Sequence, residues 1–95
     1  MAVNITRRPT TTVVGVETFL HLEANEVPLN DATTGAEIRH YMTLEASGHD
    51  TLRSQDFAGD WVWDGVVLPI TGSWTAHLRE VVGDASIANL AITST

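Results

Sequence analysis

The sequence contains no cysteine and no lysine, and no apolar run in it approaches the length needed to span a membrane. Without cysteine, the chain cannot form a disulfide, a thiolate metal cage or a cysteine nucleophile. Its 95 residues are 43% apolar, so one small hydrophobic core must hold the fold without a covalent staple. A single domain is the expected organisation.

Positive charge is scarce as well. The five basic residues are all arginines and face twelve carboxylates, which gives a formal net charge of −7. A surface of this sign repels phosphate and anionic lipid, so we expect neither nucleic acid nor a membrane as a partner. The first residues lack the apolar stretch of a signal peptide, so we expect synthesis and retention in the cytoplasm of the producing cell.

Thirteen threonines, many valines and isoleucines, and glycine or Asn/Asp punctuation about every ten residues favour β-structure over helix. Apolar and polar residues alternate with a period of two inside most of the intervening segments. The pattern predicts seven strands, at about Thr10–Val14, Val16–Ala24, Ala36–Leu44, Thr51–Gln55, Asp60–Val67, Ser73–Val82 and Ser86–Thr93.

The alternation also predicts which side chains face the core. Leu20 and Leu22 share one face of their strand, while His21 and Glu23 share the other. Trp74, in phase with two apolar neighbours, is the expected central anchor. Seven short strands at this spacing predict an all-β fold, an immunoglobulin-like antiparallel β-sandwich, although a barrel built from the same strands fits the pattern too.

Residues 1–9 are predicted to form an extended N-terminal arm, because few of them are core-forming and Pro9 cannot donate to a sheet ladder. Residues 10–95 are predicted to form the sandwich domain. Arg7, Arg8 and Pro9 then become candidate interaction residues, since the planar guanidinium of arginine holds carboxylates and carbonyls in a fixed geometry.

The four histidines show no zinc-ligand spacing. His21, His49 and His77 are predicted to lie at the surface, whereas His40 is in phase with Met42 on an apolar strand face, where a hydrogen-bonded core histidine is the usual outcome. Because no nucleophile motif, glycine-rich phosphate loop or paired-acid cleft signature is present, we expect neither enzymatic activity nor a cofactor.

Trp61 and Trp63 fall on one face of the same predicted strand. We expect the core to bury one of them and an interface to use the other, because tryptophan is enriched at protein interfaces. The two tryptophans are therefore candidate interaction residues together with the arginines of the arm.

The combination of a leader-free chain, the arm with Arg7-Arg8-Pro9, threonine-rich strands and an acidic surface resembles the immunoglobulin-like modules of tailed-phage virions. That resemblance implies a non-catalytic accessory protein of the virion, made in the host cytoplasm, that decorates or cements a capsid or tail lattice. It implies a capsid or tail protein as the partner, with a homo-oligomer as a further possibility.

A second pattern is the segment Val16–Phe19, followed by Pro28-Leu29 and later by Val67-Leu68-Pro69 and Gly72-Ser73-Trp74. It is similar to the periplasmic copper-handling β-sandwich domains of copper-resistance systems. The alternative function that this resemblance implies is copper binding, for which His40 and Met42 are the available histidine and methionine.

Overall fold

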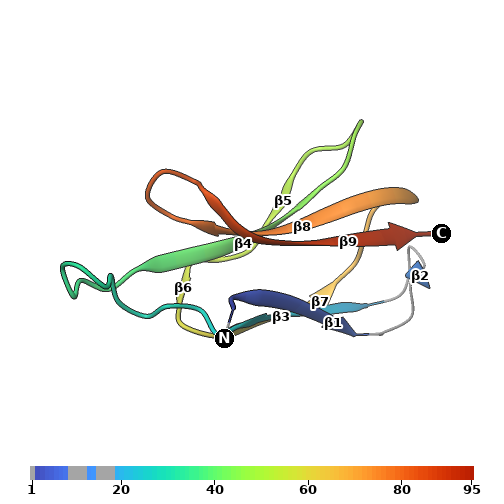
Figure 1. The fold of residues 1–95 in the computed structure, drawn as a ribbon. Coiled ribbons are helices and arrows are strands. Elements are labelled where there is room, and N and C mark those ends of the chain that lie inside the picture. Colours follow the sequence, from blue (N-terminus) through green and yellow to red (C-terminus); the bar gives the residue numbers. More distant parts are fainter. Residues whose placement is uncertain (1, 9–12, 15–18) are drawn as a thin grey trace.

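The chain folds into two layers of β-sheet (Figure 1). The computed structural model describes residues 2–8, 13–14 and 19–95. No helix in these ranges has the length and apolar character to cross a lipid bilayer. The described residues form nine strands, namely β1 (Asn4–Arg8), β2 (Val13–Val14), β3 (Leu20–Asn25), β4 (Arg39–Glu45), β5 (Leu52–Arg53), β6 (Phe57–Ala58), β7 (Trp61–Val66), β8 (Gly72–Glu80) and β9 (Ser86–Ser94).

One layer has the strand order β1-β3-β7 and the other the order β2-β9-β8-β4-β5, with β6 pairing beside β4. All these pairs are antiparallel except β2, which runs parallel to β9. The chain changes layer between β3 and β4. The sheets follow the immunoglobulin arrangement, in which β1, β3 and β7 pack against β4, β8 and β9. β5 extends the second sheet beyond β4.

The predicted fold class is confirmed, because the described residues form an all-β structure of two packed sheets. Each of the seven predicted segments overlaps a strand of the structure, although residues 10–12 and 16–18 of the first two segments lie outside the described residues. The structure adds two strands that the pattern did not indicate, β1 and the two-residue β6.

The core lies between the two layers and contains the predicted inward faces of β3, β4 and β8. Trp74 is its largest fully buried side chain, with 1% of its surface exposed, and its Nε1 donates a hydrogen bond to the Ile70 carbonyl at 3.1 Å. The ring of His49, in the β4–β5 turn, lies 5.6 Å from the Trp74 ring. His49 is therefore half-buried, although a surface position was expected for it.

The segment predicted as a free arm is a strand of the sandwich from Asn4 to Arg8. Ile5 pairs with Ala24 of β3 and is buried in the core, and the Asn25 side chain donates hydrogen bonds to Asn4 Oδ1 and to Thr6 Oγ1. Residues 4–8 therefore belong to a sheet, although an arm extending from the domain was expected there. The short segment has few apolar residues, but Val3 and Ile5 alternate in phase with the inner face of β3, which supplies a ready hydrogen-bonding edge.

Candidate functional site

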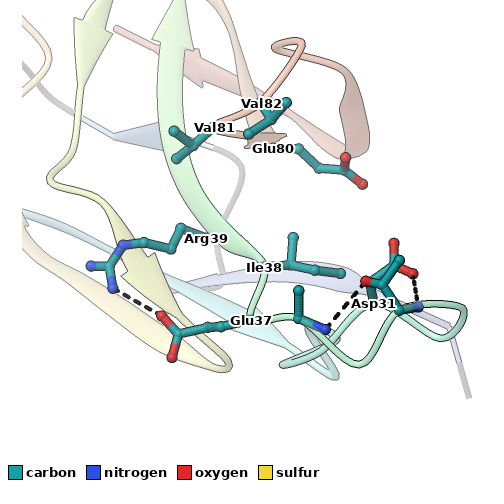
Figure 2. Close-up of a pocket in the computed structure, with 9 residues that line it drawn as sticks. Asp31, Glu37, Ile38, Arg39, Glu80, Val81 and Val82 are labelled. Carbon is teal, nitrogen blue, oxygen red and sulfur yellow. Dashed lines mark hydrogen bonds and ion pairs between the residues drawn. The ribbon is translucent and has the colours of Figure 1, made fainter.

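One end of the sandwich carries an open groove of about 480 Å³ (Figure 2). One wall comes from the loop between β3 and β4, and the other from the end of β8 and the turn that follows it. The aliphatic lining consists mainly of Ile38, Val81 and Val82, and the charged lining of Asp31, Glu37, Arg39 and Glu80.

The β3–β4 wall is fixed by Asp31. Its Oδ1 accepts hydrogen bonds from the backbone N–H groups of Thr33 and Thr34 at 2.8 and 2.9 Å, and its carbonyl accepts one from Gly35 at 2.8 Å. This is an Asx turn, closed by Gly35 in the left-handed region (φ 74°). These backbone hydrogen bonds, of which the one from Thr34 has the larger effect, hold the pKa of the Asp31 carboxyl below its usual value. The carboxylate therefore stays ionised at the groove.

The opposite wall is the tight β8–β9 turn. The Glu80 N–H donates to the Ala85 carbonyl, and Gly83 and Asp84 both adopt left-handed backbone angles that reverse the chain. The turn places Val82 at its outer edge, where 87% of the surface of this residue is exposed to solvent. The Val81 N–H donates to the Arg39 carbonyl, which anchors this wall to β4.

The groove carries an excess of negative charge. Glu37 is paired with Arg39, whose Nη1 lies 3.2 Å from Glu37 Oε1. Glu80, by contrast, makes no side-chain hydrogen bond or ion pair with any other described residue, and Figure 2 shows it pointing into the groove on the side of Asp31. Glu80 is thus an available carboxylate beside aliphatic walls.

His40 lies directly beside Glu80, because the two residues are register partners in β4 and β8. Its side chain is in the core, 1% exposed, with its ring 6.4 Å from the Phe57 ring. Neither ring nitrogen has a hydrogen-bond partner among the described residues. The predicted inward position is confirmed, but the expected hydrogen bond is missing. Burial lowers the pKa of His40, and the nearby Glu80 opposes this only in part, so the imidazole is neutral.

The first prediction concerns pH and His40. Because the pKa of His40 is lower in the folded than in the unfolded chain, the unfolded state takes up the proton first as the pH falls. The free energy of unfolding is then highest above the unfolded pKa of about 6.5 and decreases below it. We expect His40→Leu to flatten this decrease between about pH 7.5 and about pH 5.

Urea unfolding midpoints at several pH values measure this difference. The other described histidines and the carboxylates with lowered pKa values, Asp31 and Glu45, remain in the variant, so the comparison isolates His40. Equal slopes for the two proteins over this pH range would contradict the assignment.

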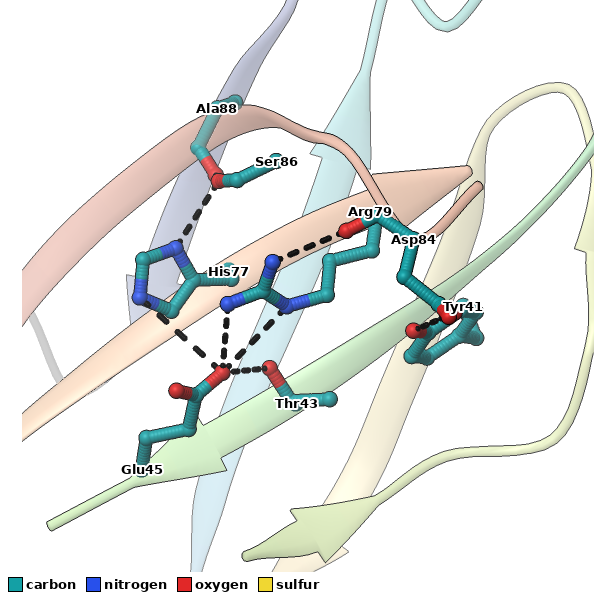
Figure 3. A network of polar contacts seen from close by, with 8 residues as sticks. All are labelled: Tyr41, Thr43, Glu45, His77, Arg79, Asp84, Ser86 and Ala88. Carbon is teal, nitrogen blue, oxygen red and sulfur yellow. Dashed lines mark hydrogen bonds and ion pairs between the residues drawn. The ribbon is translucent and has the colours of Figure 1, made fainter. Parts of the chain in front are cut away.

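The outer face of the second sheet carries a polar network centred on Glu45 (Figure 3). Glu45 Oε2 accepts hydrogen bonds from the Thr43 hydroxyl at 2.7 Å and from Arg79 Nη2 at 2.9 Å, and it lies 4.0 Å from His77 Nε2. The hydrogen bond from the Thr43 hydroxyl has the largest effect on the pKa of the Glu45 carboxyl and holds it below its usual value, and Arg79 lowers it further.

Arg79 extends the network to the β8–β9 turn, where its Nη1 donates to the Asp84 carbonyl at 2.9 Å. The Tyr41 hydroxyl donates to Asp84 Oδ1, and this hydrogen bond raises the pKa of Tyr41. The Arg53 guanidinium lies 3.8 Å from the centre of the Tyr41 ring. The groups of the network form hydrogen bonds with one another, and these bonds hold in place the turn that forms one wall of the groove.

The second prediction tests that role. Arg79→Ala removes the hydrogen bonds to Glu45 and to the Asp84 carbonyl, so we expect the free energy of unfolding to fall by about 1–2 kcal/mol. Arg39→Ala is the matched control, because its pair with Glu37 is exposed and contributes less than about 0.5 kcal/mol. Urea unfolding measures both, and equal losses would contradict a structural role for the network.

The arginines predicted for docking lie on β1. Arg7 is the register partner of Leu22, so its side chain leaves the strand on the inner face, and its Nη1 is buried without a partner among the described residues. Arg8 is exposed and pairs with His21, toward the end of β3 that lies away from the groove. Pro9 lies outside the described residues. The groove and these arginines are therefore at different ends of the sandwich.

Trp61 and Trp63 share the inner face of β7, as register partners of Ala24 and Leu22. Both are half-buried and pack against the core. The expectation that the core would bury one of them completely is therefore not met. Trp61 also stacks on Phe57 with a ring separation of 5.0 Å. They are incompletely covered because β7 ends its sheet, with no further strand of the described residues beyond it.

His40 and Met42, the candidate copper ligands, face the same side of β4, and both are enclosed in the core. A copper ion could reach them only if the two sheets separated locally. Within the part of the chain that the structure describes, no group of three His, Cys, Asp or Glu side chains lies close enough to hold a metal ion.

The sequence patterns did not single out the groove. Asp31-Ala32-Thr33-Thr34-Gly35 has the composition of an Asx turn, and Val82 is an apolar residue directly before the Gly83-Asp84 reversal. These local signals indicate two turns. Only the fold shows that the two turns lie at one end of the molecule, on either side of a groove.

Comparison of this chain with protein-family models, with curated proteins and with solved structures gives no match. The fold and the site geometry therefore carry the functional argument.

Proposed function

We propose that this chain is a non-enzymatic accessory protein of a phage virion, which decorates or cements a capsid or tail lattice and binds through the loop end of its sandwich. The observation that carries the proposal is the groove, whose walls are two internally hydrogen-bonded turns with an exposed aliphatic residue, Val82, at the rim. Such a surface supports contact with another molecule, since binding sites are typically concave, with apolar walls and a few charged or polar groups.

The shape of the molecule supports attachment by one end. The sandwich is 44 Å long and 25 by 18 Å across. The β3–β4 loop and the β8–β9 turn, whose residues line the groove, lie at one end of it (Figure 1). A narrow body held by its end occupies a small footprint and projects outward. Many copies on a repeating lattice then bind neighbouring sites without overlapping, and weak single contacts add up through multivalency.

The experiment uses particles of the phage that carries this gene, prepared with the gene deleted. We expect the purified, fluorescently labelled chain to co-sediment with these particles at saturation in many copies per particle. We expect Val82→Asn to weaken this binding about tenfold, because it removes the exposed aliphatic side chain from the rim of the groove without changing the charge.

Val67→Asn is the matched control, because Val67 is also exposed and follows β7 at the opposite end of the sandwich. Arg8→Ala tests the arginine predicted for docking without removing its strand. A wild-type chain that stays in the supernatant would overturn the proposed function. Equal losses for Val82→Asn and Val67→Asn would overturn binding through the loop end.

A further inference from the structure

We propose that the groove binds a lysine or arginine side chain from an extended segment of the partner protein. This inference rests on the proposed contact function and names the chemistry that the groove recognises. Two kinds of surface meet in the groove and select this occupant, namely an unpaired carboxylate and an aliphatic wall.

The charged surface consists of Glu80 and Asp31. Glu80 has no ion-pair partner among the described residues, and its carboxylate points into the groove on the side of Asp31 (Figure 2). Asp31 is turned toward the same space and keeps its charge because backbone N–H groups hydrogen-bond to its carboxylate. Two negative charges thus face one another from walls that are far apart in the sequence.

Among the residues that the structure describes, no neighbouring cation balances this pair. Arg39 is engaged by Glu37, and the imidazole of His40 next to Glu80 is enclosed in the apolar core and neutral. The groove therefore carries about two uncompensated negative charges on a chain whose formal charge is −7. It repels carboxylate and phosphate groups and attracts a cation.

The aliphatic surface selects among cations. Ile38, Val81 and Val82 line the groove beside the carboxylates, and Val82 is largely exposed. A lysine or arginine side chain matches both surfaces, because its methylene stem packs on aliphatic groups while its charged head reaches a carboxylate. The volume of about 480 Å³ is that of a small-ligand site, large enough for one such side chain and part of its backbone.

Backbone amide shifts of the isotope-labelled full chain, followed by NMR during titration, test the inference. The probes are three capped peptides, Ala-Leu-Lys-Leu-Ala and its variants with norleucine or glutamate in place of lysine. We expect the lysine peptide to shift the amides of residues 31–39 and 80–85, with binding that weakens as salt is added. We expect the norleucine peptide to bind about tenfold more weakly and the glutamate peptide not to bind.

Two variants of the chain test whether the lysine peptide binds at the groove. Glu80→Gln removes the available carboxylate and is expected to weaken binding of the lysine peptide about tenfold. Asp50→Asn also removes one negative charge, but from the β4–β5 turn, away from the groove, and should leave binding unchanged. The amide spectrum of each variant without peptide shows that it is folded.

Equal binding of the lysine and norleucine peptides would overturn the inference, as would equal effects of Glu80→Gln and Asp50→Asn. These outcomes are distinct from failure of the proposed function, which the particle assay measures separately. A chain that binds particles but not the lysine peptide would retain the function and lose this inference.

Discussion

Replacing Trp74 with alanine is expected to lower the free energy of unfolding by about 3–5 kcal/mol, the usual range for removing a large aromatic side chain from a core. Trp74 is enclosed between the two sheets and donates a hydrogen bond to the Ile70 carbonyl, so the variant loses packing and leaves a partly buried carbonyl without its donor. Since a domain of this size has a total stability of about 5–15 kcal/mol, the variant should be unfolded or close to it.

Urea unfolding followed by circular dichroism measures this loss. Trp63→Ala is the control, because it removes the same side chain from the inner face of β7, an edge strand where the ring is only half-buried. We expect it to cost about half as much or less, because less apolar surface is withdrawn from water there. A smaller loss for Trp74→Ala than for Trp63→Ala would contradict the assignment of Trp74 as the central core residue.

Deleting residues 1–8 is expected to unfold the domain, whereas removing a free arm would leave its stability unchanged. The deletion takes away β1, which pairs with β3 over all five of its residues. The first sheet would keep only β3 and β7, and Leu22 and Ala24 of the core would lose the cover that Ile5 provides. A two-stranded layer is marginally stable in water at best.

Point variants separate the effects of packing and of chain length. Ile5→Ala is expected to lower the free energy of unfolding by about 2–4 kcal/mol, because Ile5 is buried in the core. Arg8→Ala, at an exposed position of the same strand, should change it by less than about 0.5 kcal/mol. An unchanged urea midpoint for the deletion variant would show that β1 does not contribute to the sandwich.

The alternation of apolar and polar residues predicted most of the sandwich. In β8, for example, Trp74, Ala76 and Leu78 share the buried face, as their spacing of two indicates. This prediction succeeds because side-chain direction in a strand is a local property of the backbone. The same rule correctly placed His40 inside and His21 on the outer face.

The errors concern segments whose structure depends on a distant partner. Residues 4–8 have a weak pattern of their own and become a strand because β3 offers them an edge. Trp61 and Trp63 are half-buried because their sheet ends at β7, and the number of strands in a sheet is not encoded in either residue's neighbours.

The sequence by itself determined which residues could form strands, which faces would be apolar and where the turns would reverse the chain, because each of these depends on neighbouring residues. Only the tertiary structure brought Glu80 beside Asp31 and left both next to exposed aliphatic groups. Asp31 lies in the loop between β3 and β4, whereas Glu80 is the last residue of β8. Their distance is set by how the two sheets pack and not by any local preference of the chain.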